Sequence, residues 1–193
     1  MSTPHPSLRE RYTALSAQNK NILTTKEIVI FGVLGAIMFC SKLIMESLPN
    51  IHLLGMLTMI YTIVFRKKAL YPIYINVLLT GIYAGFNIWW IPYLYIWTIL
   101  WAVTMLLPRN MPKALKCVVY PIICCMHGLF YGTLYAPAQA LFMHMNLKAT
   151  IAWIAAGLPW DVIHGIGNLT LGTLIFPLSE LLKKLNRKSF RPD

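Results

Sequence analysis

The sequence predicts an all-α integral membrane protein with six transmembrane helices and both termini in the cytoplasm. Composition is the first observation behind this prediction. Hydrophobic residues make up 58% of the 193 residues and charged residues only 12%, about half of the roughly 25% that is usual in soluble domains. The second observation is that residues 28–182 are almost continuously apolar. About 155 residues hold six helices of the roughly 17–25 residues that a bilayer requires.

The placement of the basic residues predicts the orientation of the chain. Most of the 17 Lys and Arg residues lie in four clusters that alternate with connections nearly free of positive charge. Cytoplasmic loops retain Lys and Arg, so the four clusters are expected on the cytoplasmic side. The clusters are Arg9, Arg11, Lys20 and Lys26; Arg66, Lys67 and Lys68; Arg109, Lys113 and Lys116; and Lys183, Lys184, Arg187, Lys188 and Arg191. The net charge of +11 therefore reports topology, and no nucleic acid is expected as a partner.

Turn signals and basic clusters divide the apolar region into its helices. A cytoplasmic segment, residues 1–27, precedes the transmembrane domain, and a basic cytoplasmic tail, residues 183–193, follows it. Pro49 and Asn50 mark an outer connection after the first helix, and the Arg66 cluster ends the second. The six helices are expected at residues 28–45, 51–65, 70–88, 89–107, 114–135 and 160–182.

Three prolines from residue 92 onward mark turns or breaks. Pro92, after two tryptophans, marks a tight turn before the fourth helix, and Pro137 is expected to interrupt the fifth. Residues 138–157 contain a second apolar run at 151–156 that is too short to cross a bilayer. We expect an outer loop there with a short interfacial helix. Pro159 is then expected to break the backbone before the sixth helix.

The sequence offers no positive sign of catalysis, a cofactor or a metal. It lacks the short motifs of zinc proteases, serine hydrolases and P-loop ATPases. The four cysteines form no CxxC pair and lie in or beside apolar helices as core residues: Cys40, Cys117, Cys124 and Cys125. No two histidines have ligand spacing. We therefore expect a protein that is not an enzyme, with no catalytic residues, no cofactor and no metal site.

Polar residues recur on one face of each of three predicted helices. Asp161, His164 and Asn168 are spaced three and four apart, and so lie on one face of the sixth helix. Such groups are expensive within a bilayer. Two interpretations remain open: they line a binding site, or Asp161 caps its own helix while His164 and Asn168 bond to neighbouring helices. Glycines at 165, 167 and 172 indicate close packing against a neighbour or a ligand.

A candidate substrate site collects the polar and aromatic residues near the outer ends of the helices. A cluster of this kind suits a flat or heterocyclic small molecule, although an interfacial belt is the commoner reason for Trp and Tyr near helix ends. The candidate substrate-binding residues are Glu46, Asn50, His52, Tyr83, Asn87, Trp89, Trp90, Tyr131, Gln139, Trp160, Asp161, His164 and Asn168.

Residues 156–168 carry a resemblance to a known family. They include Gly157, Leu158, Pro159, an aromatic residue and Asp161, followed by two hydrophobic residues and His164. With the small size and the six expected helices, this segment resembles the substrate-binding S components of energy-coupling factor (ECF) transporters of bacterial cell membranes. The resemblance implies capture of a vitamin or similar micronutrient outside, with the segments 46–52 and 138–160 closing over the ligand.

The resemblance also implies partners for the chain. S components associate with a membrane coupling protein and two cytoplasmic ATPases, and commonly dock through small residues in the first helix. Gly32, Ala36 and Cys40, spaced four apart, match that character. Two other functions stay open. One is a small multi-spanning scaffold of the cell-envelope or shape-determining type, and the other is a proton-coupled secondary transporter using Asp161 and His164.

Overall fold

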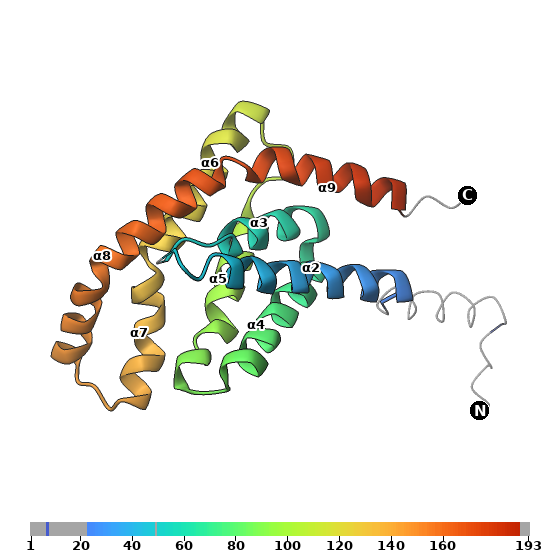
Figure 1. Ribbon diagram of the computed structural model, residues 1–193. Helices are drawn as coiled ribbons and strands as arrows, with labels where there is room; N and C mark the ends of the chain where they lie inside the picture. Colours follow the sequence, from blue (N-terminus) through green and yellow to red (C-terminus); the bar gives the residue numbers. More distant parts are fainter. Residues whose placement is uncertain (1–6, 8–22, 49, 190–193) are drawn as a thin grey trace, which may run out of the picture.

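The protein folds into a bundle of α-helices without strands in the described part of the chain (Figure 1). The computed structural model describes residues 7, 23–48 and 50–189. Most of the predicted segment 1–27, the loop residue Pro49 and the end of the tail, 190–193, lie outside the described residues. The helices are α2 (Thr25–Ile44), α3 (Leu54–Phe65), α4 (Leu70–Ala84), α5 (Tyr93–Leu106), α6 (Lys113–Leu129), α7 (Tyr131–Phe142), α8 (Leu147–Gly172) and α9 (Ile175–Ser189), with the 3-10 turns η1 (Arg66–Ala69) and η2 (Ile88–Trp90).

Four segments of the described chain are long and apolar enough to cross a membrane. They are Thr25–Ile44, Ile88–Leu106, Lys113–Phe142 and Leu147–Gly172. The expected second and third helices are shorter than predicted, because α3 has 12 residues and α4 has 15. At 1.5 Å per residue they span about 18 and 22 Å, against about 30 Å of hydrocarbon. The prediction of an all-helical chain is confirmed for the described residues, and four of their segments are compatible with membrane crossing. The six crossings stay a prediction.

Helix α3 lies at the centre of the bundle. Its residues from Leu54 to Thr62 are buried except Leu57, and α2, α5, α6, α8 and α9 all contact it. Met59 packs in one cluster with Met38 of α2, Trp97 of α5 and Ile175 of α9. A helix that is enclosed by other helices can be shorter than the roughly 20 residues that a lipid-facing helix needs to cross a bilayer.

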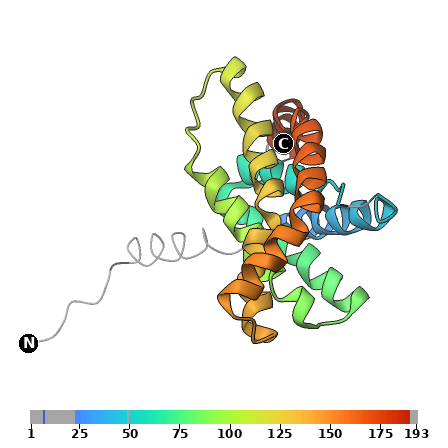
Figure 2. The same ribbon diagram turned by 90° about the vertical axis from the view of Figure 1, so that its left-hand side faces the viewer.

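Helices α6 and α8 run in opposite directions with their backbones in close contact (Figures 1 and 2). A Cβ on Gly128 would lie 2.9 Å from the backbone of His164 and Gly165, and one on Gly172 would lie 2.7 Å from Pro121 Cα. Between these points Asn168 donates to the Cys124 carbonyl at 3.1 Å. The expectation that the glycines at 165 and 172 pack closely is confirmed, and the neighbour is α6.

The predicted outer loop at 138–157 is wrong. Helix α8 begins at Leu147 and continues through Gly157 and Pro159 to Gly172. Asn146 starts it, because its side chain accepts a hydrogen bond from the N–H of Ala149 at 2.9 Å. Pro159 therefore lies in the helix interior, where it leaves one carbonyl without its usual donor but does not end the helix. The apolar run at 151–156 is part of this helix.

The predicted sixth helix at 160–182 is divided in the structure. Helix α8 ends at Gly172 and α9 starts at Ile175, so the expected boundary between domain and tail at residue 182 falls inside α9. Pro177 lies in the first turn of α9, where the missing N–H costs nothing, whereas it would interrupt a continuous helix. Ile175 and Ser179 of α9 are buried, whereas Lys184 and Arg187 are exposed.

Pro137 also fails to interrupt the chain where expected. Residues 114–135 were predicted as one helix, but α6 ends at Leu129 and α7 runs from Tyr131 through Pro137 to Phe142. The hydroxyl of Tyr95 donates to the carbonyl of Leu134 at 2.8 Å, one turn before Pro137. This hydrogen bond joins α7 to α5 within the turn that precedes Pro137.

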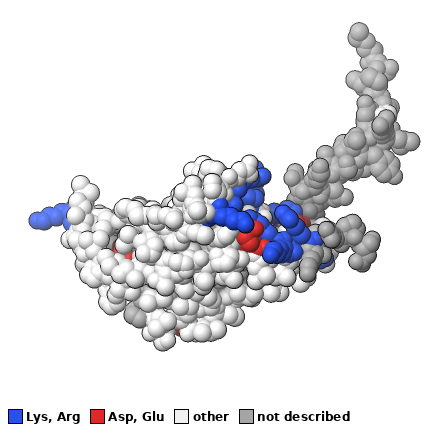
Figure 3. All heavy atoms as spheres, turned by 90° about the horizontal axis from the view of Figure 1, so that it is seen from above, with Lys and Arg blue, Asp and Glu red and all other residues white. Residues whose placement is uncertain are grey.

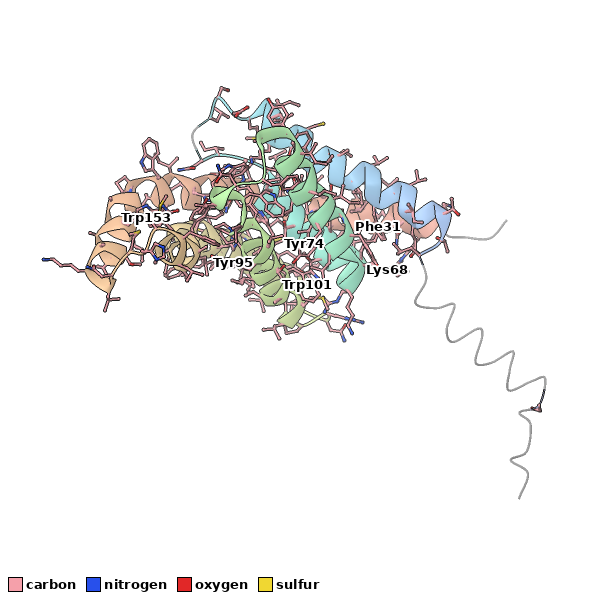
Figure 4. All side chains as sticks on the ribbon, turned by 90° about the horizontal axis from the view of Figure 1, so that it is seen from below. Phe31, Lys68, Tyr74, Tyr95, Trp101 and Trp153 are labelled. Atoms are coloured by element: carbon pink, nitrogen blue, oxygen red, sulfur yellow. The ribbon has the colours of Figure 1, made fainter. Side chains whose placement is uncertain are left out.

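The described basic residues gather mainly at one end of the molecule (Figure 3). Lys68 of η1 pairs with Glu27 of α2 at this end, and Trp153 of α8 lies at the opposite end (Figure 4). The start of α2 and the end of α9 are close together, since Glu27 and Arg187 line one surface hollow. The described residues of three predicted basic clusters therefore lie on one side of the bundle.

Candidate functional site

A cavity of about 210 Å³ opens where the C-terminal end of α2 and the following loop meet the core of the bundle. The loop and the start of α3 form one wall, α5 forms a second, and Tyr131 and His164 form a third. Its lining residues are Lys42, Met45, Glu46, Leu48, Asn50, Ile51, His52, Leu54, Tyr93, Trp97, Tyr131 and His164. Eight of these twelve residues carry a polar or ionisable side-chain group.

The inner wall of the cavity is aromatic. The ring of His164 lies 4.8 Å from the ring of His52 and 4.8 Å from that of Tyr131, measured between centroids. Trp97 extends the cluster, with its ring 6.0 Å from His52 and 6.3 Å from Tyr93. These rings come from four different parts of the chain, and they surround the cavity with flat, polarisable surfaces.

Three buried nitrogens on this wall have no hydrogen-bond partner within the described part of the chain. They are Nδ1 of His52, Nε1 of Trp97 and Nε2 of His164. Most buried polar groups in folded proteins are hydrogen-bonded, so a group of unpartnered ones needs an explanation. A bound molecule that accepts from the indole and exchanges hydrogen bonds with the imidazoles would satisfy all three.

Charged groups lie at the rim of the cavity. The Lys42 ammonium lies 5.0 Å from the ring centre of Tyr93 and 6.0 Å from that of Trp89, so aromatic faces support its charge. Glu46 follows one helical turn later and is exposed. A ligand entering the cavity therefore passes one cation and one carboxylate before it reaches the aromatic wall.

His52 is neutral at physiological pH in this environment. Burial lowers its pKa from 6.5 to about 4, and the positive charge of Lys42 adds to the effect. A neutral imidazole has one donor and one acceptor nitrogen. His52 thus offers a ligand hydrogen bonding of either kind without a charge.

The structure brings five of the thirteen predicted site residues together in the cavity: Glu46, Asn50, His52, Tyr131 and His164. Trp89 is adjacent, since its ring lies 5.7 Å from that of Tyr93. Asn50 also fixes the loop, because its side-chain amide donates to the carbonyl of Trp160 at 3.4 Å. Its φ of 56° lies in the left-handed region that asparagine tolerates better than most residues.

Other predicted site residues lie outside the cavity and make structural contacts. Tyr83 is exposed and packs on Phe39, and Asn87 caps η2. The indole of Trp90 donates to the Val77 carbonyl at 2.8 Å. The remaining residues that do not line the cavity are Gln139, Trp160, Asp161 and Asn168.

Asp161 is placed differently from the prediction. It lies in the middle of α8 and does not cap that helix. Its carboxylate accepts the backbone N–H of Gly132, with nitrogen–oxygen distances of 3.0 and 3.1 Å, in the first turn of α7. A carboxylate at a helix N-terminus is favoured by the helix dipole. Asp161 thus stabilises the point where the chain turns from α6 into α7, next to Tyr131.

Three polar residues that line the cavity are not among the candidate substrate-binding residues: Lys42, Tyr93 and Trp97. Tyr93 and Trp97 are four residues apart, which puts them on one face of α5. Lys42 is the isolated cation at the C-terminal end of the apolar helix α2, four residues before Glu46. Both signals are present in the sequence.

The predicted docking residues Gly32, Ala36 and Cys40 lie on a side of α2 that faces away from α4. A Cβ on Gly32 would meet nothing within 4 Å, whereas one on Gly35 would lie 2.5 Å from Ile75 of α4. Cys40 is exposed, and Val33 and Ile37 beside it are 53% and 48% exposed. The surface formed by Gly32, Val33, Ala36, Ile37 and Cys40 is apolar; Val33, Ile37 and Cys40 are exposed, and Gly32 and Ala36 are partly buried.

The arrangement of the cavity favours binding a small molecule by stacking and hydrogen bonding. Within the described ranges, no group of three or more His, Cys, Asp or Glu side chains is placed to hold a metal ion. No protein-family model, curated protein or solved structure matches this chain.

Proposed function

We propose that this chain is the substrate-binding S component of an ECF-type importer in a bacterial cell membrane. It captures a vitamin or related micronutrient at the outer face, and partner subunits drive uptake with ATP. The cavity between α2, α5 and α8 is the observation that carries the proposal. A volume of about 210 Å³ is below the 300–1,000 Å³ typical of drug-sized ligands, which favours a small, flat substrate.

The chemistry of the cavity supports a heterocyclic substrate. Aromatic rings of Tyr93, Trp97 and Tyr131 offer stacking surfaces, and the imidazoles of His52 and His164 offer hydrogen-bonding nitrogens. Lys42 and Glu46 at the rim suit a ligand with a polar or charged substituent directed to the water. A scaffold protein has no use for buried polar atoms without partners, which cost free energy in the folded chain.

The uncovered side of α2 supports the partner assignment. Membrane helices associate through packing and need surfaces on which backbones approach closely. Gly32, Ala36 and Cys40 leave such a surface free, while Gly35 on the other side already packs on α4. We assign this uncovered side to the membrane coupling protein, which in turn binds the two ATPases.

In this proposal the chain crosses the membrane six times, and both termini are cytoplasmic. Helices α3 and α4 supply the two short crossings, joined at η1 by three basic residues. The basic end of the bundle faces the cytoplasm, in agreement with the positive-inside rule. The candidate cavity then faces the outside.

Native mass spectrometry of protein gently purified from its own membranes tests the proposal. We expect a co-purified small molecule together with a coupling protein and ATPase subunits. The molecule is expected to disappear from the double variant His52→Leu, Tyr131→Leu and to remain in Tyr83→Leu, which is outside the cavity. An empty wild-type protein that carries only cell-envelope proteins would identify a scaffold instead.

A further inference from the structure

A second cavity, of about 250 Å³, lies at the basic end of the bundle. Arg66 of η1, Arg109 of the loop after α5, Lys116 of α6 and Lys183 of α9 all line it, together with the buried ring of Tyr120. These four cations come from four separate segments. Its other lining residues are Ile63, Val64, Thr104, Leu107 and Pro108, so no carboxylate lines it.

Arg66 is held in this cavity by an unusual backbone conformation. Its φ is 55°, and it is one of three described non-glycine residues with a positive φ. A bulky residue adopts this region only where the surroundings impose it. The Trp101 indole donates to the Arg66 carbonyl at 3.1 Å, and the Arg66 guanidinium donates to the Met105 carbonyl at 2.9 Å. Nε of Arg66 is buried and has no partner among the described residues.

The positive charges are only partly compensated. Glu180 pairs with Lys183 at 2.7 Å, and this hydrogen bond lowers the pKa of Glu180. Burial lowers the pKa of Arg66, and the positive charge of the nearby Arg109 lowers it further. With Glu180 counted against the four cations, the cavity keeps a net charge of about +3. Guanidinium groups offer the forked donors that match the oxygens of a phosphate.

Helix α3 separates the two cavities. Leu54 at its start lines the aromatic cavity, and Ile63 near its end lines the basic one, so the two lie at opposite ends of the bundle. The apolar residues of the basic cavity, such as Val64 and Leu107, suit the glycerol or upper acyl part of a lipid. A basic pocket between helices at the boundary of the bilayer is a typical site for an anionic head group.

We propose that the cavity formed by Arg66, Arg109, Lys116 and Lys183 binds a phosphate group, carried either by an anionic phospholipid or by a free phosphate compound. The guanidinium groups of Arg66 and Arg109 bind the phosphate oxygens, and the two lysines neutralise the remaining charge. The site is independent of the proposed transport function, because it needs neither a substrate in the aromatic cavity nor partner subunits.

The test uses the full chain in nanodiscs of phosphatidylcholine with increasing phosphatidylglycerol. Native mass spectrometry counts the retained phosphatidylglycerol, and inorganic phosphate is added in a second arm. The test variant carries two substitutions, Arg109→Gln and Lys116→Gln. Arg66 is left unchanged because it also bonds to the backbone. The matched control is Arg109→Gln with Lys113→Gln, since Lys113 lies on the same helix, one turn away, and does not line the cavity.

We expect wild-type protein to retain phosphatidylglycerol in preference to phosphatidylcholine. Arg109→Gln/Lys116→Gln is expected to bind it about fivefold more weakly than the control variant, the effect of about one cation near a membrane surface. If millimolar inorganic phosphate displaces the retained phosphatidylglycerol, the ligand is a soluble phosphate compound. If phosphate does not displace it, the ligand is a lipid. Equal binding by the two variants overturns the proposal, and so does the absence of both a preference for phosphatidylglycerol and any binding of inorganic phosphate.

Discussion

The carboxylate of Asp161 in α8 accepts the backbone N–H of Gly132 in α7 with both of its oxygens. A Cβ on residue 132 would lie only 2.5 Å from Oδ2 of Asp161, so glycine is the residue that admits this contact. The two residues join α8 to the turn between α6 and α7. Tyr131 and His164, which line the aromatic cavity, are each within three residues of this contact in the sequence.

Gly132→Ala should therefore lower the stability of the fold. The added methyl displaces the carboxylate and weakens a charge-assisted hydrogen bond, a loss of about 1–3 kcal/mol. Thermal unfolding in detergent, followed by circular dichroism, measures the change. Gly157→Ala is the matched control, because a Cβ there meets nothing within 4 Å and alanine favours a helix. An equal loss of stability in both variants would show that the Asp161 contact contributes nothing.

Replacement of His52 should weaken binding of the molecule that co-purifies with the protein. His52→Leu removes both ring nitrogens from the cavity wall, and loss of one hydrogen bond costs about tenfold in affinity. The measurement is a titration of the emptied protein with that molecule by isothermal calorimetry. Tyr83→Leu is the comparison, since Tyr83 is 63% exposed and lies outside the cavity. Unchanged affinity in His52→Leu would show that the molecule does not bind at this wall of the cavity.

Two glycines of α2 should respond in opposite ways to the same substitution. Gly35→Leu forces a side chain against Ile75 and the carbonyl of Pro72, which lie 2.5 and 3.0 Å from an added Cβ. It is expected to destabilise the chain by about 2 kcal/mol or more. Gly32→Leu leaves the chain intact and is expected to prevent co-purification of the coupling protein. If the complex still forms in Gly32→Leu, this side of α2 is not the docking surface.

Acid should destabilise the region around the aromatic cavity. His52 has a folded-state pKa of about 4, against about 6.5 in an unfolded chain. Below pH 6.5 the unfolded chain binds more protons than the folded one, so stability falls as the pH drops from about 6.5 to about 4. The contribution from His52 is at most about 3 kcal/mol, and partial access to water reduces it. Unfolding temperatures measured at pH 7.5 and pH 5 should differ less in His52→Gln than in the wild type, and an equal difference in both would contradict this assignment.

Helix positions were predictable where composition and charge define them. The first predicted helix, 28–45, corresponds to α2, and the turn signals at Trp89, Trp90 and Pro92 mark the start of α5. Prolines misled the prediction, because Pro137 and Pro159 were treated as breaks. In the structure Tyr95 supports the turn before Pro137, and the Asn146 cap begins α8 thirteen residues before Pro159. The chain instead turns at Thr173 and Leu174, just before Pro177 in the first turn of α9.

The aromatic cavity was predictable in part. Polar residues at the outer ends of helices identified His52, Tyr131 and His164, since a bilayer penalises such groups without a reason. The pattern does not separate residues that face a cavity from residues that bond to a neighbouring helix. Asp161 and Asn168 lie on the same helix face as His164. Asp161, however, accepts from the Gly132 backbone, and Asn168 donates to the Cys124 carbonyl. That distinction depends on the path of α6, which only the assembled bundle defines.

The close contact of α6 with α8 has a consequence for communication between the two ends of the molecule. With close backbone contacts at Gly128 and Gly172, the two helices have little room to slide past each other, so a tilt of one helix would carry the other with it. Lys116 of α6 lines the basic cavity, and His164 of α8, which lies against Gly128, lines the aromatic cavity. A ligand that prefers one tilt then biases both cavities, and thermodynamic reciprocity requires each ligand to alter the affinity for the other by the same factor.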